Sequence, residues 1–154
     1  MKREPDVDRY SLYFWLPLSI VTGLVILWIS AGAEFAGAPA MRAGGMAPTT
    51  GMMALVFVLM WAAFAYAASI TFPHGVVEKR LLWAALLLPV GLILLLRAQW
   101  IALALVVGLA WLAVAVMLGW RYTRREPLAV LMMIPMVVAA FSSVLLSFTI
   151  LVIP

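Results

Sequence analysis

Few residues in this 154-residue chain are of the types that carry out acid–base, nucleophilic or metal chemistry. It contains one histidine, His74, with no second ligand at metal-binding spacing, and it contains no cysteine. The six carboxylates all fall outside the long apolar runs, in stretches expected to be termini or loops: Glu4, Asp6, Asp8, Glu34, Glu78 and Glu126. Because acid–base catalysis and proton relays need a titratable group in the core, we expect a protein that is not an enzyme and has no catalytic residue and no metal site.

The residues that remain as candidates for a function are aromatic. Trp61 and Trp111 lie near the middle of apolar runs, with small residues beside them. Trp15 is ambiguous, and the other tryptophans lie toward the ends of runs, where indoles anchor proteins at a membrane interface: Trp28, Trp83, Trp100 and Trp120. A buried indole N–H needs a hydrogen-bond partner, so Trp61 and Trp111 indicate either a ligand site or contacts in a core or between subunits.

The composition places these tryptophans in a membrane. Hydrophobic residues make up 68% of the chain and charged residues 10%, against about half and a quarter in soluble domains. Apolar runs of about 20 residues predict five transmembrane helices, at about 10–31, 51–72, 81–96, 100–120 and 127–154. We therefore expect an all-α polytopic membrane protein, with residues 1–154 forming a single five-helix bundle.

The loops and charges predict how this bundle sits in the bilayer. Only Arg97, Ala98 and Gln99 separate the third and fourth runs, which indicates a tight antiparallel hairpin. With five spans, all basic residues except Arg42 and Arg97 fall on the N-terminal side, so the N-terminus is expected in the cytoplasm and the C-terminus outside. The basic residues are spread over three short segments, which gives nucleic-acid binding little support. The outer loop 32–50, rich in glycine and proline, is either a connector or a lid.

Small and hydroxyl-bearing residues recur at helical spacing within the runs. The rows are Ser19, Gly23 and Ser30; Ala62, Ala65 and Ser69; Ala104, Gly108, Trp111, Ala115 and Gly119; and Met136, Ala140, Ser143 and Ser147. Such faces let helices approach closely in lipid. Plain bundle packing explains most of them, and homodimerisation through the same faces is compatible with the pattern.

The chain resembles the TspO/MBR family of tryptophan-rich sensory proteins, also called translocator proteins. The resemblance rests on size, five spans, a long first loop, the short basic connection after the third span, and two local matches. Residues 109–113, with Trp111 at their centre, are similar to the family's leucine and tryptophan pattern. Pro135, followed by Phe141, Leu146 and Ser147, resembles a family run in the fifth span.

Two functions from different classes are open. The resemblance implies a sensory or regulatory protein of the bacterial inner membrane, with no intrinsic cofactor, whose bundle encloses a flat apolar ligand such as a tetrapyrrole, sterol, carotenoid or lipid. Its expected lining is Trp61, Tyr66, Trp111, Phe141 and Ser147. The alternative is a non-catalytic accessory subunit of a photosynthetic or respiratory membrane complex, because spans without polar residues suit packing against proteins, lipids and pigments. The expected partners are membrane lipids and a second copy or a larger complex.

Overall fold

A computed structural model describes residues 9–31, 50–71, 75–123 and 126–152, which form five helices and no strand. The helices are α1 (Arg9–Ala31), α3 (Thr50–Thr71), α4 (Val76–Arg97), α5 (Ile101–Thr123) and α6 (Pro127–Val152). Four of them, α1, α4, α5 and α6, are long and apolar enough to cross a membrane, and α3 contains the shorter apolar stretch Val58–Ile70. The all-α membrane class expected from the sequence is therefore confirmed. The loop 32–49 and His74 lie outside the described residues.

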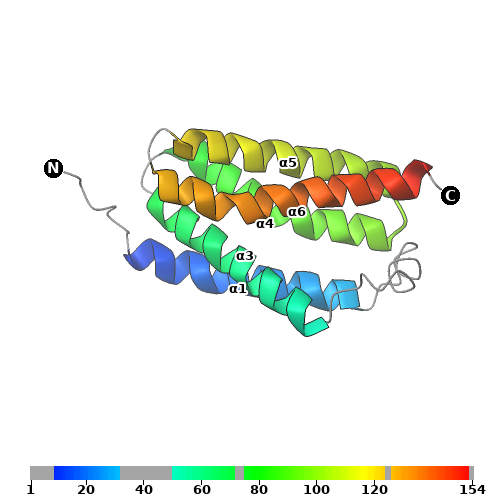
Figure 1. Cartoon of the computed structure of the whole chain (residues 1–154), viewed down its shortest axis with the longest axis horizontal. Helices are drawn as coiled ribbons and strands as arrows, with labels where there is room; N and C mark the ends of the chain where they lie inside the picture. The colour runs from blue at the N-terminus through cyan, green and yellow to red at the C-terminus, as the bar shows by residue number, and fades with distance from the viewer. Residues whose placement is uncertain (1–8, 32–49, 72–74, 124–125, 153–154) are drawn as a thin grey trace.

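The five helices lie side by side and run along the length of the molecule (Figure 1). Their contacts close a ring. Each helix packs mainly against two others, in the order α1, α3, α6, α5, α4 and back to α1. Since the chain reverses at every connection, neighbours in this ring are antiparallel except α1 and α4, which run in the same direction. Helix α1 begins at the opposite end of the bundle from the end of α6 (Figure 1).

The hairpin expected at Arg97, Ala98 and Gln99 is present between α4 and α5. The N–H of Gln99 donates to the Leu96 carbonyl at 3.2 Å, and that of Trp100 donates to the Leu95 carbonyl at 3.0 Å. Gln99 adopts a φ of 60° between these two bonds. Two such bonds around a residue in the left-handed conformation form a Schellman motif, which ends α4. Helix α5 then begins at Ile101, two residues after Gln99.

The third helix is longer than the apolar run at 81–96 on which its prediction rests. Helix α4 begins at Val76 with Gly75 as its N-cap residue, at a φ of 153° that glycine tolerates. Its first turn contains Glu78, which the sequence placed in a loop, and that expectation is wrong. The error has a physical cause: Glu, Lys and Arg, the residue types at 78–80, are good helix formers, so a helix can extend past the apolar segment that marks it in the sequence.

The interior of the ring is filled by the small-residue faces and by large side chains. The buried face of α5 consists of Ala104, Gly108, Trp111, Ala115, Leu118 and Tyr122. The helical row predicted for α5 therefore faces inward, with Leu118 and Tyr122 continuing it beside Gly119. On α6, Met136, Ala140 and Ser147 are buried as their spacing indicates, and Ser143 is partly buried.

Candidate functional site

The main aromatic feature of the structure is a cluster contributed by three helices, which we call the aromatic cluster: Phe14 and Trp15 of α1, Trp61 and Phe64 of α3, and Trp83 of α4. Trp15 is at its centre and is fully buried. Its ring centroid lies 5.5 Å from that of Trp83 and 6.3 Å from that of Phe64. Phe64 in turn meets Trp61 edge to face at 5.8 Å. These separations are those of favourable aromatic pairs.

The close approach of α1 and α3 depends on one glycine. Gly23 lies on the buried face of α1, two helical turns after Trp15 and one turn after Ser19. A Cβ atom added at Gly23 would lie 2.5 Å from Cδ1 and 3.0 Å from Nε1 of Trp61. The pyrrole edge of the Trp61 indole therefore rests directly on the α1 backbone, in space that only glycine leaves open.

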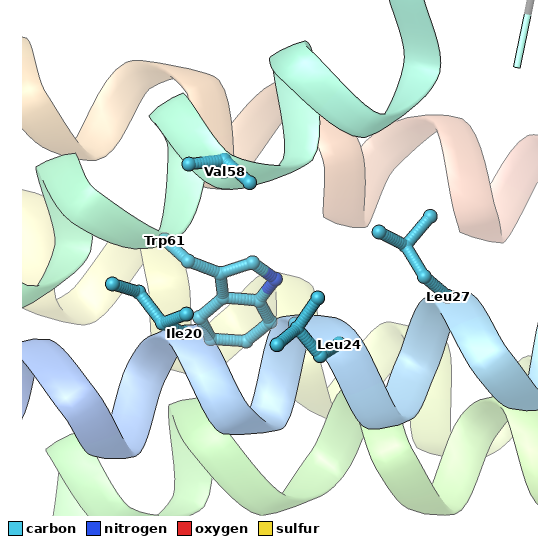
Figure 2. A pocket seen from close by; sticks show the side chains of 6 residues that line it. Ile20, Leu24, Leu27, Val58 and Trp61 are labelled. Atoms are coloured by element: carbon cyan, nitrogen blue, oxygen red, sulfur yellow. The ribbon is translucent and has the colours of Figure 1, made fainter. Parts of the chain in front are cut away.

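A small pocket lies beside this contact, between α1 and α3 (Figure 2). Its volume is about 10 Å³, and it is lined by Ile20, Gly23, Leu24, Leu27, Val58 and Trp61. Figure 2 shows the indole of Trp61 between the two helices, with its nitrogen facing the space bounded by Leu24, Leu27 and Val58. Leu24 and Val58 are exposed, so the pocket opens toward the outer surface of the α1–α3 pair and not toward the centre of the ring.

The indole of Trp61 is 1% exposed, and its N–H has no hydrogen-bond partner among the described residues. The same is true of the Trp111 N–H and of the hydroxyls of Ser11 and Ser19. By contrast, most described hydroxyls donate to a carbonyl one turn earlier in their own helix, as Thr22 does to Leu18 at 2.9 Å. Buried polar groups are nearly always paired, so each of these exceptions calls for an explanation.

The residues predicted to line one site fall in different parts of the ring. Trp61 belongs to the aromatic cluster, whereas Trp111 makes no ring contact with another described aromatic residue. Tyr66 is partly buried on α3, and the Ser147 hydroxyl is buried on α6 but already donates to the Ser143 carbonyl at 2.9 Å. Phe141 is 52% exposed on the outer surface of α6. The structure therefore does not bring the five residues together, and Trp61 alone of them lies beside the pocket.

Trp111 lies on the other side of the ring, where α5 packs against α4 and α6. Gly108, one turn before it, leaves room for these neighbours, because a Cβ there would lie 3.3 Å from Val144 of α6 and 3.7 Å from Leu92 of α4. The indole is buried within this packed region. The surroundings of Trp111 fit helix packing better than they fit a ligand.

Polar contacts concentrate at the end of the bundle where α1, α4 and α6 begin. The carboxylate of Glu78 on α4 accepts a hydrogen bond from Arg121 of α5 in an ion pair of 2.7 Å. The next residue, Tyr122, donates its hydroxyl to the Ala67 carbonyl of α3 at 3.3 Å. This second contact crosses the ring, because α3 and α5 are not neighbours in it. Together the two contacts connect three helices at one end.

The described residues at the pocket can stack against a ligand and donate a hydrogen bond to it. No group of three or more histidine, cysteine, aspartate or glutamate side chains that could hold a metal occurs within the ranges the structure describes. Glu78, the one buried carboxylate among the residues that the structure describes, is engaged by Arg121 at the end of the bundle. At the pocket, the aromatic cluster offers apolar surface and Trp61 offers one N–H donor.

Sequence reasoning missed several residues that matter here. Trp15 was ambiguous and Trp83 resembled an interfacial anchor, yet the two meet in the aromatic cluster. One signal for Trp15 was present in the sequence: it precedes Ser19 and Gly23 at four-residue intervals, on the face that α1 buries. No local pattern indicated the pairing of Glu78 with Arg121, because the two are 43 residues apart.

Comparison of the chain with family models, with curated proteins and with solved structures finds no match.

Proposed function

We propose that this chain is a five-span protein of the TspO/MBR type that binds a flat apolar ligand on the α1–α3 side of its helix bundle. The observation that carries the proposal is the buried indole of Trp61, whose N–H lacks a partner among the described residues and faces a pocket open to the outer surface. The rigid aromatic cluster behind it holds the indole in place. The role is sensory or regulatory, and no catalytic step is assigned.

The ligand rests against the outer face of α1 and α3, with one edge at Trp61. Around the pocket this face carries exposed aliphatic side chains at helical spacing: Val21 and Leu24 of α1, and Leu55 and Val58 of α3. A flat molecule such as a tetrapyrrole, sterol or carotenoid has the apolar surface to cover them, and each buried methylene group contributes about 0.8 kcal/mol where water is displaced. In lipid the gain comes instead from packing and from the hydrogen bond.

The orientation follows from charge. Among the described basic side chains, Lys79, Arg80 and Arg121 lie at the end of the bundle where α1 begins, and Arg97 lies at the other. By the positive-inside rule, we propose that the N-terminus is cytoplasmic, the C-terminus is outside, and the membrane is the inner membrane of a bacterium. In this arrangement α3 crosses the membrane together with α1, α4, α5 and α6, which makes five spans.

The test is titration of the purified protein in lipid nanodiscs with protoporphyrin IX, followed by quenching of tryptophan fluorescence. We expect saturable quenching whose affinity falls at least tenfold in the Trp61→Phe variant. The matched control is Trp28→Phe, which removes an exposed indole of α1 and leaves the affinity unchanged. Quenching that does not saturate, or equal affinity in the two variants, contradicts the proposal.

One observation favours a second candidate function. The interior of the ring is filled by side chains from all five helices, and the pocket at Trp61 has a volume of only about 10 Å³. Such packing also suits an accessory subunit of a larger membrane complex, with its outer surface covered by partners. Purification in a gentle detergent separates the two: stoichiometric co-elution with large partners supports the subunit, and an isolated monomer or dimer supports the binding protein.

A further inference from the structure

The pocket beside Trp61 presents one polar atom to whatever enters it. Its other lining side chains, those of Ile20, Leu24, Leu27 and Val58, are aliphatic, and Gly23 has none. The backbone around it belongs to α1 and α3, whose amide and carbonyl groups bond within their own helices. The Trp61 N–H is therefore the single available donor, and no acceptor side chain accompanies it.

The size of the pocket matches one oxygen atom, but the site is a poor one for water. The pocket has room for about one water-sized group. A buried water makes two to four hydrogen bonds, and here only one is available. An oxygen atom that is covalently attached to an apolar body needs only one donor, because its remaining contacts are made by that body.

The depth of Trp61 excludes the ester carbonyls of phospholipids. Trp61 lies eleven residues after Thr50 and ten before Thr71, so it is about 15 Å along α3 from either end. The hydrocarbon core of a bilayer is about 30 Å thick, and the ester groups lie at its two surfaces. An acceptor that reaches Trp61 must therefore belong to a molecule dissolved in the hydrocarbon core.

The same environment selects against ligands that carry their own donors. A hydroxyl or amine entering the pocket finds no acceptor there, and leaving such a group unpaired in an apolar medium costs about 2–7 kcal/mol. A carbonyl oxygen only accepts hydrogen bonds and brings no donor that would need an acceptor in the pocket. Hydrocarbons, for their part, leave the indole N–H without a partner.

On the basis of the function proposed above, we propose that the ligand at this pocket carries a ring carbonyl, as quinones and cyclic ketones do, and that its oxygen accepts the N–H of Trp61. The carbonyl oxygen enters the pocket between Leu24 and Val58, and the flat ring system lies on the exposed aliphatic face of α1 and α3. The aromatic cluster keeps the indole from turning away, since the Trp61 ring is held between Phe64 and the backbone at Gly23.

A matched pair of probes tests this assignment. We use 2,3-dimethyl-1,4-naphthoquinone and 2,3-dimethylnaphthalene, which share a carbon framework and differ in the two carbonyl oxygens; the chain has no cysteine to react with the quinone. The protein is labelled with ¹⁵N-tryptophan in nanodiscs, and the seven indole N–H signals are followed by NMR. The Trp61 signal is assigned by its loss in Trp61→Phe or, if that variant does not fold, by exclusion from the other six single variants.

We expect the quinone to shift the Trp61 N–H proton downfield by at least 0.3 ppm in a saturable manner, and the hydrocarbon to shift it by less than a third of that. Val58→Phe, which fills the pocket from an exposed position, should abolish the shift, and Leu59→Phe, also at an exposed position, should retain it. The carbonyl assignment is overturned if the two probes shift the Trp61 N–H proton equally, or if the quinone does not change its chemical shift. If the carbonyl assignment fails but protoporphyrin IX still binds in the quenching titration, the proposed function stands. If neither the two probes nor protoporphyrin IX bind, the carbonyl assignment and the proposed function both fail.

Discussion

Replacing Gly23 by alanine probes the contact on which the α1–α3 interface depends. The added Cβ would lie 2.5 Å from Cδ1, 3.0 Å from Nε1 and 3.2 Å from Cγ of Trp61. Carbon atoms in favourable contact are about 3.5–4.0 Å apart, so the overlap is about 1 Å. All three atoms belong to one rigid ring that also contacts Phe64, so a small side-chain rotation does not relieve it. We expect a loss of about 1–3 kcal/mol in the free energy of unfolding, as is usual for overpacking.

The assay is reversible unfolding by SDS in mixed micelles, followed by circular dichroism. Gly91→Ala and Gly119→Ala are matched controls, because an added Cβ at either position meets nothing within 4 Å. Each control should lower the free energy of unfolding by no more than about 0.5 kcal/mol. In a Trp61→Leu background the cost of Gly23→Ala should fall to the level of the controls, since the ring it strikes is gone. A Gly23→Ala variant as stable as the two controls would refute the reasoning.

Three further predictions concern hydrogen bonds and charge, with the same unfolding assay. Glu78→Gln and Arg121→Gln should each cost about 0.5–1 kcal/mol, a modest figure because the Arg121 side chain is 42% exposed and solvent screens the pair. The double variant should lose less than the two losses added together, and strict additivity would show that the pair is not coupled. Tyr122→Phe should cost about 0.5–1.5 kcal/mol by removing the bond to the Ala67 carbonyl, and a neutral result would mean that this cross-ring contact is not formed. Ser19→Ala should be neutral or stabilising, because its buried hydroxyl has no partner in the described part of the chain, whereas Ser147→Ala should be destabilising through loss of the bond to Ser143. The reverse order of these two serine variants would contradict the hydrogen-bond assignment.

The fold class could be predicted from the sequence because it follows from composition and local pattern. Long apolar runs specify membrane helices whatever surrounds them, and the short connection at Arg97, Ala98 and Gln99 leaves room only for a hairpin. The buried faces were also predictable where small residues recur every three or four positions, as at Ala104, Gly108, Trp111 and Ala115 of α5.

The candidate site could not be predicted in the same way, because it depends on which helices are neighbours. Trp61 and Trp111 look equivalent in the sequence, but the ring order places Trp61 with α1 and Trp111 between α4 and α6. Trp15 and Phe64 join Trp61 only through the contact of α1 with α3. Phe141 shows the converse: its position in a family-like run indicated a lining residue, and the rotation of α6 turns it outward.

The measurement that tests the central claim most directly is equilibrium binding of protoporphyrin IX to Val58→Phe and Leu59→Phe proteins in nanodiscs. Both changes add one phenylalanine at an exposed position of α3, and only Val58 lines the pocket. The account predicts that Leu59→Phe binds like the unaltered protein and that Val58→Phe binds at least tenfold more weakly. Equal affinities in the two variants would contradict a ligand site at Trp61.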